Sequence, residues 1–215
     1  MSSRPLDRRP FLRAAGALIA SAALPIVPAR AAAARVATPR QTPGPFYPTR
    51  FPDDVDNDLV TVAGRSQPAQ GRVTHVAGRR RSGPGRPLRG AQVETWQCDV
   101  HGRYHHVESS WQTQASDDNF QGYGRTVTDD TGAYAFRTIK PVAYSGRTPH
   151  IHFAVSAPDF PRFITQMYVS GEPRNERDGV LMSVRGLAAR DRLIVPLRLA
   201  AEPGALAGTF DIVLG

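Results

Sequence analysis

The sequence has a single cysteine, Cys98, among its 215 residues, so no disulfide can form within the chain. A lone cysteine of this kind is expected to be a small buried apolar residue, not a reactive thiol. The one extended apolar stretch, residues 14–28, is too short and too rich in alanine for a membrane-spanning helix. Repeats and long low-complexity tracts are absent after this stretch, and helix signals are sparse. The remaining length suits one domain with a substantial core.

Basic residues exceed acidic ones and give a formal net charge of +8, but the first 33 residues carry much of this excess. They hold five arginines and one aspartate, so the rest of the chain carries 8 − 4 = +4. Its basic residues are scattered, apart from Arg79, Arg80 and Arg81. A Ser-Gly-Pro-Gly stretch follows these three, and a solvated loop is therefore expected, not a surface that binds nucleic acid.

Residues 1–31 have the features of an export signal. Arg8 and Arg9 stand in a box of the twin-arginine type, a weakly apolar stretch follows, and residues 29–31 fit an A-x-A cleavage site. The twin-arginine route exports folded proteins, which suits a protein that takes up its metal in the cytoplasm. An ordinary secretory signal is the alternative. Either signal places the mature protein outside the cytoplasm, in the periplasm or secreted.

Residues 32–70 are predicted to form an extended arm. Within it, residues 41–48 contain three prolines and a glycine, which exclude a helix and favour an extended segment packed on the surface.

Residues 71–215 are predicted to form an all-β domain, an antiparallel β-sandwich, because short apolar or alternating runs recur between Gly, Pro, Asp and Ser. Pro196 indicates an edge or a bulge in one of these strands, and residues 176–189 allow a short helix. The strands are expected at residues 71–76, 91–97, 133–139, 150–155, 163–169, 193–199 and 209–214.

Two histidines in the predicted strand 150–155 are candidate metal ligands. Side chains alternate along a strand, so His150 and His152 point to the same face. An H-x-H pair alone is a weak signal. Tyr144, however, precedes His150 across a Ser-Gly turn that can bring its phenol over the start of the strand, and Tyr104 follows the turn after strand 91–97.

Two phenols and two imidazoles form an unusual ligand set. Phenolate is a hard, anionic oxygen donor, whereas imidazole is a borderline nitrogen donor. Zinc rarely selects phenolate and calcium does not select imidazole, but ferric iron accepts both. An Fe(3+) ion held in this way points to chemistry on catechols, which are themselves chelating phenols.

Further sequence blocks accompany these four residues in a fixed order along the chain. They lie at residues 44–47, 87–97, 99–104, 119–125, 128–141 and 210–214. With these blocks, residues 40–215 resemble the intradiol ring-cleavage dioxygenases, most closely the protocatechuate 3,4-dioxygenase β-subunit type. An arginine three residues before the first histidine makes the combination highly specific.

The resemblance implies roles for the four ligands. Tyr144 and His152 would be the axial ligands of ferric iron, Tyr104 and His150 the equatorial pair, and a hydroxide would complete the shell. The implied reaction cleaves a catechol-type ring between its two hydroxylated carbons with O2 and gives a cis,cis-muconate-type diacid. Tyr144 would leave the iron when the catechol binds and would take one of its protons.

Arg147 and Gln166 complete the implied catalytic set. Arg147 would stabilise developing negative charge with a fixed guanidinium, and the alternative for it is a surface salt bridge. Gln166 would lie beside the iron site, and the alternative is an inward polar residue bonded to a neighbouring strand. The implied partners are a small catechol and O2, with no nucleic acid and no membrane after signal removal. Both a homo-oligomer and an iron-free partner subunit stay open.

The chain departs from the family in one loop. Only Ser145 and Gly146 separate Tyr144 from Arg147, whereas this loop is longer in protocatechuate and catechol dioxygenases. One wall of the pocket is therefore missing or comes from elsewhere, so the sequence defines the substrate less well than the metal. By analogy with the family, Tyr47 and the arm around it are expected near the opening of the pocket. Trp111 and Tyr123 are further candidates, with core packing as the equal alternative for each.

Two other interpretations compete with this one. A β-sandwich binding module of the transthyretin-like or adhesive kind would share residues 90–93 and 132–136, but it would not need the tyrosine and histidine set. A zinc or Fe(II) enzyme would combine His150 and His152 with a carboxylate such as that of Asp159. No H-x-D or H-E-x-x-H spacing supports it, and extradiol cleavage is disfavoured for the same reason.

Overall fold

A computed structural model describes residues 37–82, 85–107, 112–158 and 160–214, all within one compact unit, Ala32–Gly215. The predicted signal at residues 1–31, together with Trp111 and Asp159, lies outside the described residues. In the described ranges, no helix is long and apolar enough to cross a membrane.

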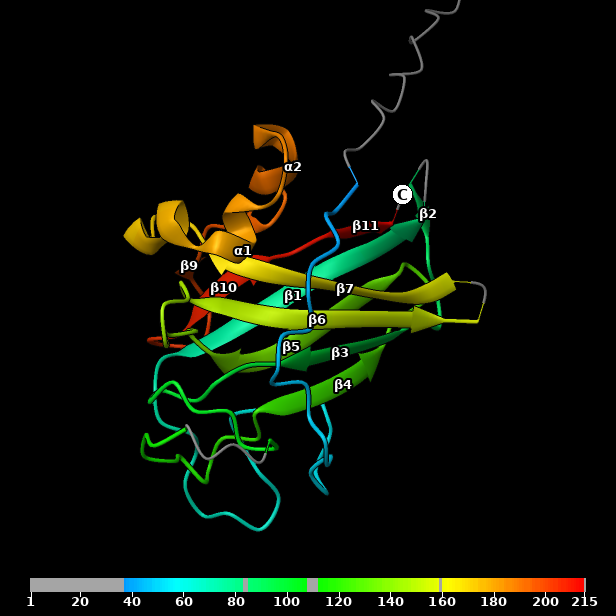
Figure 1. The fold of residues 1–215 in the computed structure, drawn as a ribbon. Helices are drawn as coiled ribbons and strands as arrows, with labels where there is room; N and C mark the ends of the chain where they lie inside the picture. Colours follow the sequence, from blue (N-terminus) through cyan, green and yellow to red (C-terminus); the bar gives the residue numbers. More distant parts are fainter. Residues whose placement is uncertain (1–36, 83–84, 108–111, 159, 215) are drawn as a thin grey trace, which may run out of the picture. The chain divides into compact units, whose positions relative to one another are not determined.

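The described chain forms two β-sheets and a few short helices (Figure 1), which confirms the all-β fold. One sheet has the order β11, β1, β10, β9, and β2 and β5 also pair with β1. Its strands are β1 (Val73–Ser82), β2 (Arg86–Pro87), β5 (Ala133–Ile139), β9 (Arg198–Leu199), β10 (Leu206–Thr209) and β11 (Ile212–Leu214).

The second sheet has the order β4, β3, β6, β7, β8. Its strands are β3 (Gln92–Trp96), β4 (Tyr123–Val127), β6 (His150–Ala157), β7 (Phe160–Val169) and β8 (Ile194–Val195). The sheets are not wholly antiparallel as expected, because β1 runs parallel to β10 and β11, and β7 runs parallel to β8.

The main core joins side chains of the two sheets, and it explains the alternation seen in the sequence. From β6, Ile151, Phe153 and Val155 enter this core together with Val76 of β1 and Phe136 of β5. The alternate residues of β6 are buried too, on the outer face of the second sheet. Strand β6 is therefore covered on both sides, which places its two histidines away from bulk water.

The covering of that outer face comes from the arm, which runs across the second sheet (Figure 1). The amide of Gln41 donates to Ile164, and the Thr165 hydroxyl donates to the Pro39 carbonyl, so the arm is bonded to β7. Phe46 of the arm is buried in a second apolar cluster with Trp96 and others. The proline-rich segment thereby forms the roof over the histidines.

The arginine run is not in a loop as expected. Arg79, Arg80 and Arg81 continue β1, because Arg79 pairs with Ala133 of β5 and Arg80 pairs with Ile212 of β11. Alternation then turns Arg80 inward, where it is fully buried and its guanidinium carbon lies 5.5 Å from the centre of the Phe160 ring.

The last predicted strands are also divided. Residues 193–199 do not form one strand, because β8 and β9 belong to different sheets and Pro196 lies in the crossing between them. Residues 209–214 are likewise shared between β10 and β11, and β4 was not expected at all. Between β7 and β8 lie three short helices, η1 (Pro173–Arg177), α1 (Gly179–Met182) and α2 (Leu187–Asp191).

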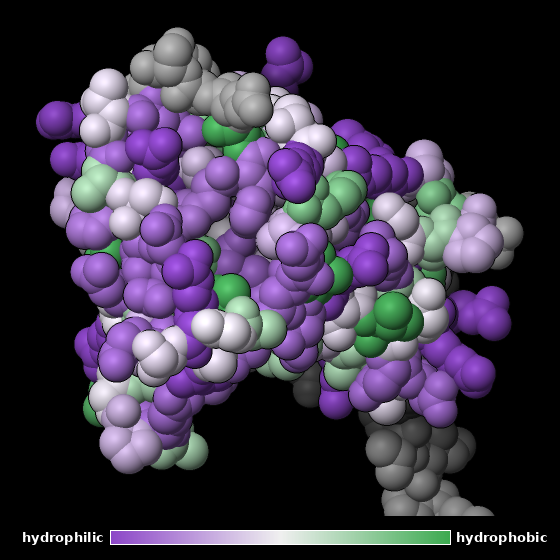
Figure 2. Space-filling model, turned by 90° about the horizontal axis from the view of Figure 1, so that it is seen from below, coloured by the Kyte–Doolittle hydropathy of each residue, from purple (hydrophilic) through white to green (hydrophobic). Residues whose placement is uncertain are grey.

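Seen from below, the surface is largely polar, with apolar residues scattered among charged ones (Figure 2). Scattered apolar residues are normal on a protein surface and do not indicate a docking area on this face.

Candidate metal centre

The two histidines lie side by side on the outer face of β6, both 1% exposed. In the sheet register His152 stands between Trp96 of β3 and Gln166 of β7. The Trp96 and His152 rings are stacked, with centroids 4.8 Å apart and an interplanar angle of 10°. The register thus fixes the imidazole of His152 before any ligand is bound.

The imidazole nitrogens converge. Nε2 of His150 lies 3.1 Å from Nε2 of His152. Nδ1 of His150 lies 2.7 Å from the Thr148 carbonyl, and since a carbonyl only accepts, this nitrogen carries the proton and Nε2 presents a lone pair. Burial lowers the pKa of His150 to about 4 and that of His152 well below its ordinary value. Both rings are therefore neutral at pH 7.

Tyr144 reaches the histidines through a two-residue turn. Ser145 and Gly146 both have positive φ, 32° and 81°, and the Arg147 amide donates to the Tyr144 carbonyl at 2.6 Å. Turns of this tight type need positive φ at both central residues, which a Ser-Gly pair provides. The Tyr144 phenol oxygen lies 3.4 Å from Nε2 of His150 and is only partly buried.

Tyr104 lies in a loop that the buried carboxylate of Asp99 organises. That carboxylate accepts the amides of His101, Arg103 and Asp117 and contacts Nε2 of His105. The Tyr104 ring meets the Tyr144 ring edge to face, with centroids 5.4 Å apart. Its own hydroxyl is buried near that of Tyr144, and among the described residues it has no hydrogen-bond partner of normal geometry.

Both phenols are protonated in the absence of a cation. Burial, followed by the nearby Cys98 and Tyr144 groups, raises the pKa of Tyr104 well above its ordinary value. Burial also raises the pKa of Tyr144, against the opposing effects of the Tyr104 hydroxyl and of the positive charge of Arg147. A trivalent cation would drive these protons off.

The four side chains fit ferric iron. The Nε2 atoms of the two imidazoles converge, and one phenol lies beside them. A second phenol oxygen is buried near the first and, among the described residues, has no hydrogen-bond partner of normal geometry. Such an orphaned polar atom is costly unless a ligand satisfies it. Within the described ranges, no group of three His, Cys, Asp or Glu side chains suits a metal ion, so these ranges do not supply the carboxylate site of the zinc alternative.

Arg147 is held beside this group and is not a surface ion pair. Its Nε donates to Oδ2 of Asp178 at 2.8 Å, and the Asp178 side chain is wholly buried. Its Nη2 donates to Oε1 of Gln166 at 2.7 Å. Gln166 therefore bonds to Arg147, and it also bonds to the arm, because its Nε2 donates to the Thr42 carbonyl at 3.0 Å.

Comparison with known proteins bears directly on this arrangement. A family model described as Dioxygenase matches residues 42–215. The chain belongs to the intradiol ring-cleavage dioxygenase family. This dioxygenase is 38% identical to the protocatechuate 3,4-dioxygenase beta chain of Burkholderia cepacia, over 79% of its own length and 76% of that chain. It is 30% identical to the catechol 1,2-dioxygenase of Acinetobacter baylyi, over 70% of its own length.

A solved structure agrees with this family. The dioxygenase domain of a dioxygenase carbohydrate-binding protein fusion from Streptomyces sp. SirexAA-E gives a TM-score of 0.65 at 31% identity, covering 83% of this chain and 98% of that one. The match to the Acinetobacter baylyi enzyme covers only 52% of that enzyme. This dioxygenase thus spans about half the length of the catechol 1,2-dioxygenase and nearly the whole Streptomyces dioxygenase domain.

Several residues of this dioxygenase's site were missed by sequence reasoning. The Tyr168 hydroxyl donates to Gln166 at 3.0 Å and to Gln41 at 3.1 Å. Tyr168 follows Gln166 by two residues in a predicted strand, so the period of two was an available signal. Asp178 precedes an apolar run as an N-cap residue does. No local pattern indicated that Gln41, far away in the sequence, joins the same network.

The roof of the site is Phe46, which is 5% exposed. Its ring stacks on Tyr104 with centroids 4.4 Å apart and an angle of 4°, and it meets Tyr144 edge to face at 5.6 Å. The candidate wall residues Tyr47 and Tyr123 instead donate to the buried carboxylate of Glu94, at 2.8 and 2.7 Å. Tyr47 thereby anchors the arm to β3, Tyr123 joins β4 to the same carboxylate, and Phe46 covers the buried phenol of Tyr104.

Proposed function

We propose that this dioxygenase binds ferric iron through Tyr104, Tyr144, His150 and His152 and cleaves a catechol-type ring between its two hydroxylated carbons. The observation that carries the proposal is the convergence of two imidazole nitrogens beside one phenol and a second phenol, whose buried oxygen has no partner of normal geometry in the described part of the chain. Relatives named as protocatechuate, catechol and hydroxyquinol dioxygenases support the reaction class.

The reaction balances without an added reductant. The carbon–carbon bond between the two hydroxylated carbons breaks, each of these carbons gains one atom of O2, and a cis,cis-muconate-type diacid results. When bound, ferric iron would supply a Lewis acid that chelates both oxygens of the catechol and favours its dianion.

The protein would supply the base and the electrostatic setting. Tyr144 sits on an exposed two-residue turn and is only partly buried, so its phenolate can move and accept a substrate proton at its hydroxyl oxygen. Tyr104, by contrast, is fully enclosed beneath Phe46 and stays in place. Arg147 holds a fixed positive charge beside the site for the negative charge that develops.

A visible spectrum of the iron-loaded protein, before and after anaerobic addition of catechol, tests the ligand set. A tyrosinate-to-iron band that shifts on adding catechol is expected. Tyr104→Phe should move the band, whereas Tyr134→Phe should not, because the Tyr134 hydroxyl donates to the Phe210 carbonyl in the other sheet. A protein that stays colourless after ferric loading would sink the proposal.

Turnover under 18O2 tests the reaction. The diacid formed from catechol should carry one labelled atom in each carboxyl group, a gain of two heavy oxygen atoms. Incorporation of a single labelled atom, or cleavage outside the hydroxylated carbons, would contradict intradiol chemistry.

We also propose that the protein is exported by the twin-arginine route, on the grounds of Arg8, Arg9 and the stretch that follows them. Replacing both arginines by lysine should retain the protein in the cytoplasm. Export of that variant at the parent level would contradict this route. The catechol and O2 are the proposed partners. Mass measurement of the protein purified in active form shows whether it is a homo-oligomer or a complex with a second subunit.

A further inference from the structure

The carboxylate of Asp178 holds three parts of the site region at once. Its Oδ2 accepts from Nε of Arg147 at 2.8 Å and from the Thr148 amide at 3.0 Å. Its Oδ1 accepts from the amides of Val180 and Leu181 at 3.1 and 2.9 Å. Burial would raise the pKa of Asp178, but the bonds from Arg147 and from these amides hold it below its ordinary value. The group is therefore a buried carboxylate anion with every lone-pair direction in use.

This anion fixes the plane of the Arg147 guanidinium. With Nε on Asp178 and Nη2 on Gln166, two of the three nitrogens are committed to buried acceptors. In the described ranges no residue accepts from Nη1. Arg147 thus keeps one free pair of N–H donors in a fixed orientation, next to the tyrosine and histidine cluster.

The same carboxylate also acts on one of the candidate ligands. It holds the Thr148 amide, and the carbonyl of that same residue lies 2.7 Å from Nδ1 of His150. The orientation of His150 and that of Arg147 are therefore set by one buried group that itself touches neither the imidazole nor the phenols.

We propose that Asp178 is a positioning residue for the ring-cleavage reaction, which orients Arg147 so that its free Nη1 donors meet the negative charge developing on the substrate. This inference rests on the proposed function. Asp178 acts through Arg147, so its removal should slow the chemical step and leave substrate binding largely unchanged.

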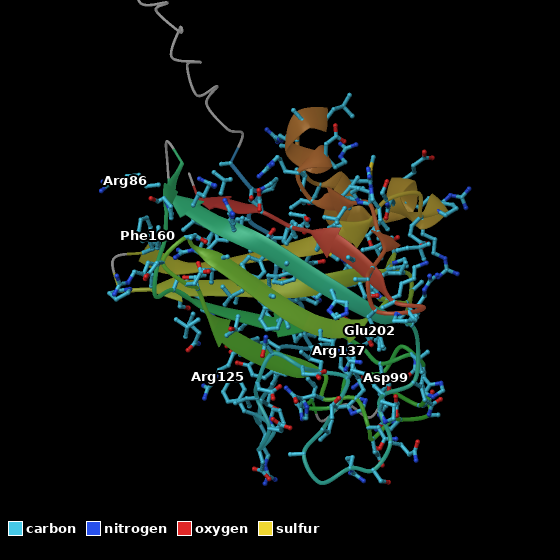
Figure 3. The ribbon with its side chains drawn as sticks, turned by 180° about the vertical axis from the view of Figure 1, so that it is seen from behind. Arg86, Asp99, Arg125, Arg137, Phe160 and Glu202 are labelled. Atoms are coloured by element: carbon cyan, nitrogen blue, oxygen red, sulfur yellow. The ribbon has the colours of Figure 1, made fainter. Side chains whose placement is uncertain are left out.

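A matched control exists elsewhere in the chain. Asp58 accepts the amides of Val60 and Thr61 through Oδ1 and pairs with Arg137 at 3.2 Å, so it repeats the hydrogen-bond pattern of Asp178 at a more exposed position. Arg137 lies on the six-stranded sheet beside Glu202 (Figure 3), whereas His150 and His152 belong to the other sheet. Asp58→Asn therefore reproduces the loss of an arginine-paired aspartate without touching the site.

The test is a double-mutant cycle of Asp178→Asn, Arg147→Gln and the double variant, with kcat for catechol expressed per bound iron. Asparagine is a good N-cap residue, so the start of α1 is retained. Asp178→Asn should lower kcat at least tenfold with KM within about threefold, and the double variant should be no slower than Arg147→Gln. Asp58→Asn should keep kcat within about twofold.

Three outcomes overturn the inference. The first is that Asp178→Asn keeps the kcat per bound iron of the parent protein. The second is that the fold-losses in kcat of the two single variants multiply in the double variant. Either result means that Asp178 does not act through Arg147. The third is a parent chain that cleaves no catechol at all, which overturns the proposed function as well. If the parent protein cleaves catechol but the kcat losses of the two single variants multiply in the double variant, only the role of Asp178 is overturned and the proposed function stands.

Denaturant unfolding of the iron-free variants gives a readout without turnover. Arg147→Gln leaves Asp178 as an unpaired buried anion, so the second substitution should restore part of the lost stability. If Asp178→Asn folds poorly, Asp178→Ser keeps the cap and serves in the same cycle. If the losses of unfolding free energy in Asp178→Asn and Arg147→Gln simply add in the double variant, Asp178 and Arg147 are not coupled as the inference requires.

Discussion

The Nε2 atoms of His150 and His152 lie 3.1 Å apart in two buried, neutral rings. Because His150 carries its proton on Nδ1, Nε2 of His152 donates to Nε2 of His150 in the metal-free protein, and a cation bound to both nitrogens would replace this proton. Stacking of His152 on Trp96 and the contact of His150 with Thr148 keep the rings in this arrangement. The pair is thus pre-organised for a cation.

Ferric iron should therefore stabilise the folded protein, because the convergent donors exist only in that state. Free ion at a hundredfold excess over its Kd corresponds to about 2.7 kcal/mol of unfolding free energy. Thermal unfolding with and without a soluble ferric chelate measures this gain. His152→Ala should abolish it, whereas His75→Ala, which removes a half-exposed partner of Glu202, should retain it. An equal gain in the His152 variant would contradict the ligand assignment.

Tyr104→Phe should separate stability from iron binding. The Tyr104 hydroxyl is buried without a partner of normal geometry, so its removal should stabilise the iron-free protein or leave it unchanged, within about 1 kcal/mol. Iron affinity should fall in the same variant because one anionic donor is lost. Denaturant unfolding and iron titration check the two effects. Marked destabilisation of the iron-free variant would show that the hydroxyl has another role.

Arg80→Met should stabilise the protein by about 1–4 kcal/mol, the range found when buried ionic groups are replaced by apolar ones. All three guanidinium nitrogens of Arg80 are buried and have no hydrogen-bond partner among the described residues, and burial lowers its pKa to about 10. Its ring neighbour Phe160 lies at the opposite end of the sandwich from Asp99 (Figure 3), so catalysis should be unaffected. Urea unfolding measures the change.

The control for this variant is Arg79→Met. Arg79 is exposed on the other face of the same strand, so its replacement should change the unfolding free energy by less than about 0.5 kcal/mol. A loss of stability in Arg80→Met would mean that the cation has a partner in the folded protein.

Asp99→Asn should destabilise the protein near pH 7 and remove part of its sensitivity to acid. Burial would raise the pKa of Asp99, but bonds from His105 and the amides of Asp117 and Arg103 hold it below its ordinary value. A depressed carboxyl pKa contributes stability that is fully present above the unfolded value, about 4, and is lost as the pH falls through the folded value.

The difference in unfolding free energy between parent and Asp99→Asn should therefore shrink below about pH 4. Urea unfolding at a series of pH values checks this. Asp130→Asn is the control, since Asp130 and its partner Arg89 are both largely exposed and such pairs contribute about 0–1 kcal/mol. If the difference in unfolding free energy between the parent and Asp99→Asn stays constant with pH, the negative charge of Asp99 does not contribute to stability.

The sequence predicted the local geometry around the candidate ligands better than the outer strands. The strand period placed His150 and His152 on one face of β6, and the positive φ at Ser145 and Gly146 fits the turn expected after Tyr144. Arg80 was placed wrongly, because a run of arginines carries the composition of a loop although pairing with β5 and β11 extends β1 through it. Pro196 marked a real interruption, but composition could not show that the chain changes sheets there.

By itself, the sequence indicated the β-rich class through strand alternation, which is a local property. Its ordered motifs indicated the family and, through that resemblance, the four candidate ligands. Only the tertiary structure placed Phe46 over Tyr104, joined Gln41 to Tyr168, and set Asp178 behind Arg147. These contacts link segments more than thirty residues apart, and nothing in the local sequence encodes which distant side chain fills a given space. Packing of the arm and of α1 against the second sheet decides them.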